Sequence, residues 1–416
     1  MIRKVSIFLL FFIILFSSQA QTKLTDTARV SLMTVEPWDE AVYTFYGHTA
    51  IRIQDDSLGL DVAFNYGYFD PTQPNFLYHF VRGETDYILG NVPYSQFLNE
   101  YGQKKAGVIE QELNMMPDEK QNLWEALYIN ALPENRGYRY NFLFDNCATR
   151  PRDMIEKYIK GKIQYPPTEK QQTFRDLLHE SLDAYPWNKF GVDLVIGSGA
   201  DTIIGVREKM FLPMYLMHSF QGAQVVKNDT ISYPLVKSQQ IVLNAANKEV
   251  KDGELGWFTP IVAAFALLFL TLLVSVIQVV KMNKTILPKI YDTLLFGVAG
   301  IGGMIIFFLL FFSEHPATNP NWNFVWLNIV ALFMVILFWV RPAKKAVYFY
   351  HFINFAVLTL FVLFWWLIPQ KLPVATIPFS MSLLIRSLTN VYMLRKRKIK
   401  NKRYTSFKQM KAGWGQ

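Results

Sequence analysis

The only cysteine of this 416-residue chain, Cys147, lies where a nucleophile could be activated. The surrounding sequence, FLFDNCATR at 142–150, places it between an aromatic strand expected over 138–144 and a helix expected over 146–159. A thiol at a helix start meets free backbone N–H groups and the positive end of the helix dipole, and both favour the thiolate. The competing interpretation is a small buried hydrophobe, because free cysteines are usually inert.

A nucleophilic cysteine needs a base, and His48 has the best setting among the six histidines. In the sequence FYGHTAIRI at 45–53 it stands at the mouth of a strand expected over 49–54, and Gly47 allows a close backbone approach. A cysteine at a helix start that faces a histidine on a neighbouring strand is the geometry of papain-like acyl transfer. A strand-end histidine with satisfied hydrogen bonds is the alternative.

A third group should orient the imidazole of His48. Asn65, on a strand expected over 61–66, is our candidate, and Asp61 and Asp70 are its rivals. Each of the three could equally be a turn or cap residue.

The elements that would position these residues are a mixture of helices and strands. Strands are expected over 28–35, 49–54 and 61–66, helices over 73–81, 93–101 and 117–132, and a hairpin over the glycine-rich stretch 191–205. The pattern indicates an α+β domain that is large enough to bury a substantial core.

This domain is expected outside a membrane. Residues 1–20 have the basic start, apolar core and Ser18-Gln19-Ala20 cleavage site of a secretory signal, with an uncleaved anchor as the alternative. Five apolar stretches lie near 258–280, 291–312, 323–340, 347–368 and 373–394. Each has about the twenty residues that cross a bilayer core.

The charges indicate the orientation of these stretches. Lys and Arg follow the first and third stretches, the loop 313–322 has neither, and the tail 395–416 carries nine basic residues and no acidic one. The positive-inside rule then puts the C-terminus in the cytoplasm. We expect Arg386, near the cytoplasmic end of the fifth stretch, to snorkel.

The net charge of +9 separates along the same boundary. Residues 257–416 contribute +15, the signal +2, and the exported domain −8. This distribution excludes nucleic acid as the natural partner of the exported domain, although a pI near 9.3 would suggest it. We expect neither a cofactor nor a metal ion, and a single cysteine excludes a disulfide framework and a Cys-based zinc site.

Four separated motifs resemble the Lnb family of lipoprotein N-acyltransferases: YGHTAIR at 46–52, FNYG at 64–67, NRGYRYNF at 135–142 and DNCATR at 145–150. The resemblance implies a papain-like exported domain of circularly permuted NlpC/P60 type, followed by an all-α bundle of five transmembrane helices. The domains would be a signal peptide at 1–20, a periplasmic catalytic domain at 21–256, the bundle at 257–394 and a basic cytoplasmic tail at 395–416. The protein would be a multi-pass protein of the cell inner membrane.

The resemblance also implies the reaction. Cys147 would be the nucleophile and His48 its base, with Asn65 as the orienting group. A fatty acyl chain would pass from a membrane phospholipid, through a Cys147 thioester, to the amine of a diacylglyceryl-cysteine lipoprotein. The alternatives are an NlpC/P60-like cell-wall peptidase or amidase and a noncatalytic membrane sensor.

Four further residues are candidates for substrate binding. Arg150 and Arg152 could contact a lipid phosphate or pair with Asp153 or Glu156 on the helix surface. Tyr46 belongs to an aromatic set that suits an acyl chain or a core. His315 lies in the polar loop 313–322, which could bind headgroups or form a rigid turn.

Overall fold

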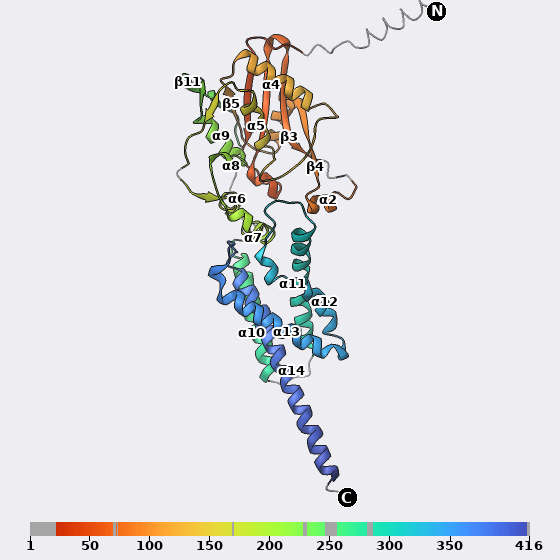
Figure 1. The fold of residues 1–416 in the computed structure, drawn as a ribbon. Coiled ribbons are helices and arrows are strands. Elements are labelled where there is room, and N and C mark those ends of the chain that lie inside the picture. The colour runs from red at the N-terminus through yellow and green to blue at the C-terminus, as the bar shows by residue number, and fades with distance from the viewer. Residues whose placement is uncertain are drawn as a thin grey trace, which may run out of the picture. The chain divides into compact units, whose positions relative to one another are not determined.

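The computed structural model describes residues 22–69, 72, 74–168, 170–227, 231–245, 256–280 and 286–413 (Figure 1). The expected signal at 1–20 therefore lies outside the described residues. The chain forms two compact units. The sheet unit contains the described residues of 1–71, 86–169 and 206–247, and the helical unit contains those of 72–85, 170–205 and 248–416. The contacts thus divide the chain differently from the single boundary expected at residue 256.

A seven-stranded antiparallel sheet forms the centre of the sheet unit. Its order is β12 (Val236–Leu243), β5 (Val108–Leu113), β1 (Arg29–Val35), β2 (His48–Asp55), β3 (Leu60–Tyr68), β4 (Asp86–Pro93) and β6 (Gly137–Arg139). The central strands are buried on both faces: Ile51 and Ile53 belong to one core, and Ala50 belongs to another. A smaller sheet has the order β11 (Ile231–Pro234), β10 (Gln224–Lys227), β7 (Lys162–Gln164).

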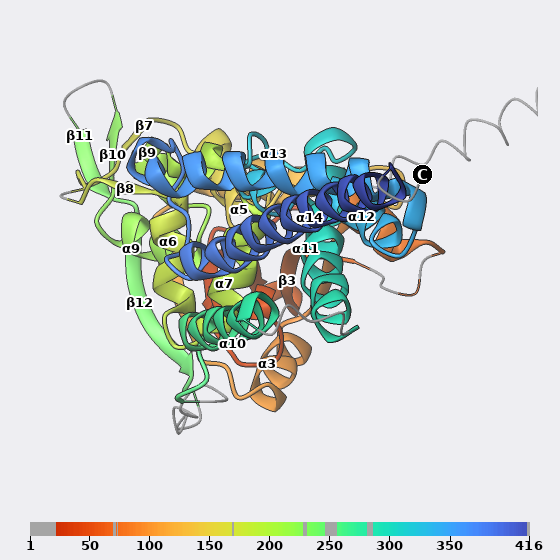
Figure 2. The same cartoon turned by 90° about the horizontal axis from the view of Figure 1, so that it is seen from below.

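Helices cover both faces of the large sheet (Figure 2). On one face pack Leu123 of α4 (Pro117–Asn130), Ile155 of α5 (Thr149–Tyr158) and Phe220 of α9 (Pro213–Gln221). On the other face pack Phe97 and Tyr101 of α3 (Tyr94–Gln103). The sheet is therefore the middle layer of an α/β unit, and β1, β2, β3, α3 and α4 all lie within a few residues of their expected positions.

Two expected elements are wrong. The aromatic strand expected over 138–144 ends at Arg139, because Asn141 turns the chain by accepting hydrogen bonds from the N–H groups of Leu143 and Phe144. The hairpin expected over 191–205 is mostly helix α7 (Pro186–Val195) and the 3-10 turn η3 (Ser198–Asp201). Pro186 starts α7 at a position where its missing N–H costs nothing.

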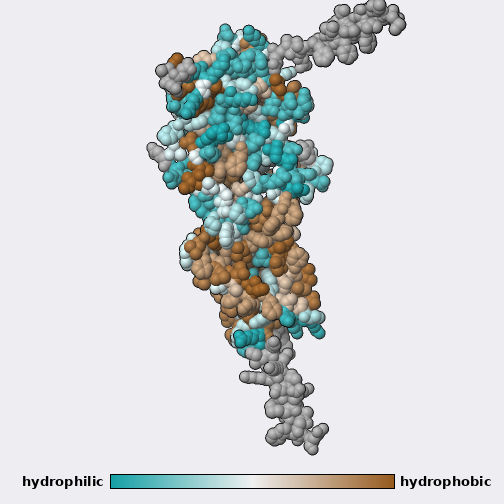
Figure 3. Space-filling model, in the orientation of Figure 1, coloured by the Kyte–Doolittle hydropathy of each residue, from teal (hydrophilic) through white to brown (hydrophobic). Residues whose placement is uncertain are grey.

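The helical unit contains the apolar helices (Figure 3). They are α10 (Pro260–Val280), α11 (Leu287–Phe311), α12 (Val330–Leu337), α13 (Lys344–Leu363) and α14 (Thr376–Gly413), which runs on into the expected tail. Within the described residues, three segments are long and apolar enough to cross a membrane: 260–280, 287–311 and 341–363. The segment 322–337 is apolar but shorter. Five spanning helices therefore remain a prediction.

Arg386 does not snorkel, and that expectation is wrong. Its side chain is fully buried, and its guanidinium donates to both oxygens of Asp292 on α11, at 2.6 and 3.0 Å. It also donates to Ser275 Oγ at 2.9 Å and Gln278 Oε1 at 2.7 Å, both on α10. The Arg386 side chain thus joins α10, α11 and α14. Its charge is tolerated in the interior because the buried carboxylate of Asp292 compensates the cost of desolvation.

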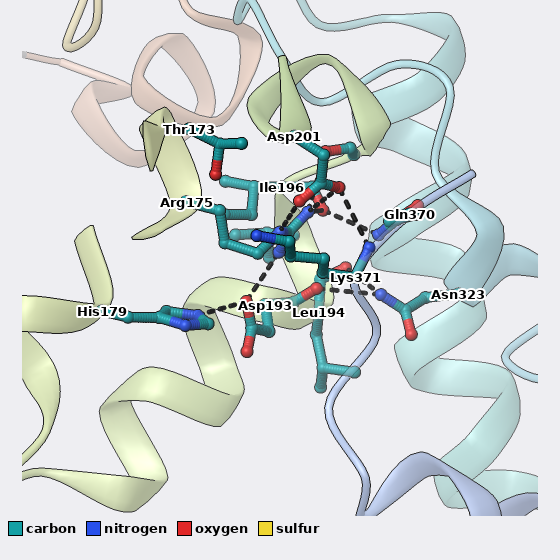
Figure 4. Close-up of polar contacts among 12 residues, drawn as sticks. Thr173, Arg175, His179, Asp193, Leu194, Ile196, Asp201, Asn323, Gln370 and Lys371 are labelled. Atoms are coloured by element: carbon teal, nitrogen blue, oxygen red, sulfur yellow. Dashed lines mark hydrogen bonds and ion pairs between the residues drawn. The ribbon is translucent and has the colours of Figure 1, made fainter. Parts of the chain in front are cut away.

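A second buried arginine organises the part of the helical unit formed by residues 170–205. Arg175 of α6 (Phe174–Leu182) donates to Asp193 at 2.6 Å and to Asp201 at 2.7 Å (Figure 4). His179 bonds to the same Asp193 oxygen at 2.8 Å. Side chains from the loops between the apolar helices complete the network: Asn323 donates to Asp193 O, Gln370 donates to Ile196 O, and Lys371 pairs with Asp176. Residues 170–205 are therefore fixed to the loops between the apolar helices by polar contacts, of which the one from Asn323 is buried.

Candidate active site

The loop that carries Cys147 is held by Asn146. The Asn146 Oδ1 accepts the N–H groups of Ala148 and Thr149 at 2.8 and 2.9 Å, so it caps the start of α5. Its Nδ2 donates to the carbonyls of Phe142 and Phe211 at 2.7 and 2.8 Å. Two helix-start amides that were expected to favour a thiolate are therefore used by the neighbouring asparagine.

The thiol lies where the large sheet stops pairing. Strands β2 and β3 pair as far as Ala50 and Asn65, and the β3–β4 register shifts between Tyr66 and Tyr68. Gly67, at the shift, has φ of +102°, a conformation that a side chain would strain. A Cβ on Gly67 would lie 3.5 Å from the Cys147 Cβ. The irregularity in β3 therefore makes room for the cysteine beside the first residues of β2.

Three donors face the half-buried sulfur. Burial raises the pKa of the Cys147 thiol to about 11, while hydrogen bonds from the N–H groups of Thr49 and Cys147 and from the Tyr140 hydroxyl act to lower it. Thr49 directly follows His48, so its hydrogen bond brings the sulfur beside the start of β2. The resting nucleophile is thus a neutral thiol whose surroundings already contain donors for negative charge.

His48 is oriented by Asn65. The two side chains meet at 3.3 Å between His48 Nε2 and Asn65 Oδ1. Because an amide oxygen only accepts, the imidazole proton lies on Nε2, and the Nδ1 lone pair is left to take a proton. Asn65 is buried and donates through Nδ2 to Ala63 O at 3.4 Å, which fixes the direction of its oxygen.

The packing around His48 keeps the ring neutral. Burial lowers the pKa of His48 to about 4, although the hydrogen bond to Asn65 and the charge of Glu100 act to raise it. The ring stacks on Tyr101 with centroids 6.1 Å apart. Gly47 places this residue, because a Cβ there would lie 2.5 Å from Val35 O. At neutral pH the site holds a thiol and an uncharged base, so the expectation of a favoured thiolate is wrong for the resting site.

The two rivals of Asn65 have different positions. Asp61 pairs with Arg52, at 2.8 Å between its Oδ1 and the arginine Nε. Asp70 lies outside the described residues. Of the three candidates, Asn65 is the one whose contact with His48 is seen.

The candidate substrate-binding residues are found in different surroundings. Arg150 pairs with both oxygens of Asp145 at 2.6 and 2.7 Å and stacks on Tyr138. Arg152 pairs with Asp153, one of the two helix-surface partners considered for it.

The other two candidates lie in different units. Tyr46 is buried, and its ring meets Phe142 with centroids 5.0 Å apart. His315 belongs to the helical unit, where its Nε2 donates to Phe80 O at 2.7 Å.

Sequence reasoning missed two contributors, Tyr140 and the backbone N–H of Thr49. The aromatic strand expected over 138–144 includes Tyr140, and the turn-forming residue Asn141 directly after it is the signal that could have indicated a turn instead. Within the described residues, no group of three His, Cys, Asp or Glu could hold a metal ion. The groups seen at this site are a thiol, an imidazole and hydrogen-bond donors.

Two family models match the chain. The Lnb N-terminal periplasmic domain matches residues 17–180, and the Lnb transmembrane domain matches residues 252–398. The first match contains Cys147, His48 and Asn65, and the second contains the apolar helices. No curated protein and no solved structure shows a significant match. The matches indicate a membrane protein whose N-terminal part is periplasmic.

Proposed function

Because this chain belongs to the Lnb family, we propose that it transfers a fatty acyl chain from a membrane phospholipid to the N-terminal amine of diacylglyceryl-cysteine lipoproteins. The observation that carries the proposal is the contact of Asn65 with His48, the residue before Thr49, whose N–H acts on the Cys147 thiol. Such a nucleophile and base divide a difficult ester aminolysis into two acyl transfers.

In the first transfer, His48 Nδ1 takes the proton of the Cys147 thiol as Sγ attacks the ester carbonyl of the phospholipid. The new C–S bond forms and the carbonyl oxygen becomes an oxyanion. Collapse of this intermediate breaks the ester C–O bond, and the leaving alkoxide takes the proton back from His48. The products are a Cys147 thioester and a lysophospholipid.

In the second transfer, the lipoprotein amine attacks the thioester carbonyl and gives a proton to His48. Collapse breaks the C–S bond, and the thiolate recovers the proton from the imidazolium. The products are the amide-linked lipoprotein and the free Cys147 thiol. The acceptor amine must arrive uncharged, because only its lone pair attacks.

The donors around the sulfur would stabilise both oxyanions. In each step, negative charge moves between Sγ and the carbonyl oxygen of the acyl group, and this oxygen is bonded to the carbon atom that Sγ attacks. The N–H groups of Cys147 and Thr49 and the Tyr140 hydroxyl already act to lower the pKa of the Cys147 thiol, and the same donors would serve the oxyanion. Fixed donors of this kind typically contribute about 10²–10³ in rate each.

The membrane part would hold both hydrophobic substrates at the bilayer. We place the protein in the inner membrane with the sheet unit in the periplasm and the C-terminus in the cytoplasm, as the basic residues of 395–416 favour. A cell-wall peptidase has no need of several apolar helices, which is the reason for preferring a lipid substrate.

Mass spectrometry of lipoprotein N-termini tests the proposal in cells that depend on this protein. Cys147→Ser and His48→Ala should accumulate diacylated forms with a free amine. His218→Ala is the matched control, because His218 is exposed on α9, and it should leave triacylation unchanged. Normal triacylation in both site variants would refute the assignment.

An assay without acceptor separates acyl transfer from peptide hydrolysis. The full-length protein, incubated with phospholipid that carries a labelled acyl chain, should acquire one label that hydroxylamine removes. Cys147→Ser should acquire none. Release of peptides from peptidoglycan without such labelling would favour the peptidase alternative.

A further inference from the structure

The short helix α2 (Phe76–Arg82) exposes three large apolar side chains. Leu77, Tyr78 and Phe80 are 72%, 51% and 45% exposed, and no residue of the helix is buried. The helix is inserted between β3 and β4, but its contacts place it in the helical unit. Three large apolar side chains on one seven-residue helix would be costly to leave in water.

The position of α2 along the apolar helices is fixed by one of them. The Tyr78 ring meets the ring of Phe308 with centroids 6.4 Å apart, and Phe308 lies in the last turn of α11. Phe311 and Phe312, at the end of the same helix, are 64% and 55% exposed. Exposed apolar side chains of α2 and of the end of α11 thus belong to one unit, in which the Tyr78–Phe308 contact joins the two helices.

The carbonyls at the end of α2 are satisfied without water. The last carbonyls of a helix lack partners within it. Here Ser313 Oγ donates to Val81 O at 2.8 Å, the Glu314 N–H donates to Arg82 O at 2.7 Å, and His315 Nε2 donates to Phe80 O at 2.7 Å. This arrangement is the one that a helix end needs in an environment with little water.

We propose that α2 lies in the outer leaflet of the bilayer, with Leu77, Tyr78 and Phe80 among the acyl chains and headgroup boundary of phospholipids. Its exposed aromatic residues are of the type enriched at this level of a membrane. Because α2 joins β3 to β4, the strand that carries Asn65 and Gly67 continues into a segment seated in lipid. A role of this contact in supplying the acyl donor rests on the proposed function, whereas the lipid contact does not.

Site-directed spin labelling of the full-length protein tests the position of α2. The lone cysteine allows a Cys147→Ser background, to which Leu77→Cys, Phe269→Cys or Ile241→Cys is added. These three positions have similar exposure, 72%, 71% and 66%, and lie on α2, on α10 and on β12 of the sheet unit. Each nitroxide-labelled protein is placed in vesicles of phosphatidylethanolamine and phosphatidylglycerol.

We expect the labels at Leu77 and Phe269 to collide more with oxygen than with a water-soluble nickel chelate, and the label at Ile241 to do the reverse. A label at Leu77 that behaves like the one at Ile241 would overturn the proposal. This result needs no enzyme activity, so it stands whether or not acyl transfer is the function.

Donor preference tests the functional consequence. Leu77→Glu should lower kcat/KM about fivefold with phospholipid in vesicles, the effect of a charge near the lipid interface. It should leave kcat/KM with a soluble short-chain ester unchanged, and Ile241→Glu should alter neither. Equal loss with both donors would count against a lipid contact. If wild-type protein transfers no acyl chain, the proposed function fails and the spin-label result still decides the position of α2.

Discussion

His48 and Asn65 are joined through a single hydrogen bond, 3.3 Å from Nε2 to Oδ1, which directs the imidazole lone pair away from the asparagine. The strand register explains the contact: Asn65 lies opposite Ala50 and so stands near the start of β2. An amide at this place sets the tautomer of His48 without adding a charge, whereas a buried aspartate would add a negative charge.

Asn65→Ala should lower kcat/KM about tenfold, the usual scale for one lost hydrogen bond that orients a group. The pH profile distinguishes orientation from simple damage. Because Asn65 raises the pKa of His48, its removal should move the acid limb of kcat/KM below the wild-type value near pH 4, while Asn65→Asp should move the limb upward. Asn91, exposed on β4, supplies the control Asn91→Ala. Acid limbs that do not move in either variant would contradict an orienting role.

The thiol of Cys147 should react slowly with iodoacetamide at neutral pH. A pKa of about 11 means that the thiolate fraction, and hence the alkylation rate, rises tenfold per pH unit between pH 7 and about pH 10. A plateau from pH 6 upward would instead indicate a preformed thiolate–imidazolium pair.

Tyr140→Phe removes a donor that lowers the pKa of the Cys147 thiol, so the alkylation curve should move to higher pH. Tyr87 stacks on Tyr140 with centroids 4.1 Å apart, and Tyr87→Phe is the matched control because it changes the same aromatic cluster without removing that donor. The measurement is the second-order alkylation rate against pH. Identical curves for the two variants would exclude the Tyr140 hydroxyl as a donor to the sulfur.

The burial of His48 should make stability fall at acid pH. The folded state keeps the pKa of His48 near 4, below its ordinary 6.5, so the unfolded state takes up the proton first as pH decreases. This contribution is complete above pH 6.5 and is lost as pH falls towards 4. The unfolding midpoint of His48→Gln should depend less on pH in this window, whereas the exposed His218→Gln should behave as wild type.

Arg175→Met should destabilise the helical unit by about 3–5 kcal/mol, because the buried Asp193 and the partly buried Asp201 would lose their cation. Arg29→Met removes an exposed pair with Asp56 and should change the free energy of unfolding by less than about 1 kcal/mol. Thermal unfolding of the full-length protein in detergent measures both. Similar unfolding temperatures for the two variants would show that the network around Arg175 contributes little.

The pair of Arg386 and Asp292 should behave as a unit. Arg386→Leu or Asp292→Leu alone leaves one uncompensated charge among apolar helices and should greatly reduce the yield of folded protein, whereas the double variant should recover part of it. The yield in membranes and the unfolding temperature check this prediction. A double variant as poor as the worse single variant would show that the two side chains act separately.

Hydrophobic pattern and capping residues predicted the strands and helices whose formation depends on neighbouring residues in the sequence. Strand β2 is a short, almost continuously buried run, and Pro117 with Asp118 and Glu119 gives α4 a strong start, so both lie within a residue or two of their expected bounds. The same reasoning failed after Arg139, where the turn at Asn141 replaces the expected strand and Asn146 then ties the loop to Phe211 O, across 65 residues. It also failed for Arg386, whose partner Asp292 lies 94 residues earlier.

The site shows the same division. Cys147, His48 and Asn65 could be nominated from residue type and from motifs, but the neutral state of the thiol depends on burial, which no motif expresses. The donor role of Tyr140 depends on the turn at Asn141, which was mistaken for a strand. Spacing therefore identifies the reacting groups, while tertiary packing sets their protonation.

The assignment of residues 72–85 and 170–205 to the helical unit has a consequence for biosynthesis. Both segments leave the ribosome before the helices they pack against: Phe308 for Tyr78, and Asn323 and Lys371 for the region around Arg175. Residues 72–85 and 170–205 therefore acquire these contacts only after the chain has been synthesised as far as Lys371. Until then, Tyr78 lacks Phe308 and the Asp193 carbonyl lacks the Asn323 amide, whereas Arg175 can already pair with Asp193 and Asp201, which precede the apolar helices in the chain.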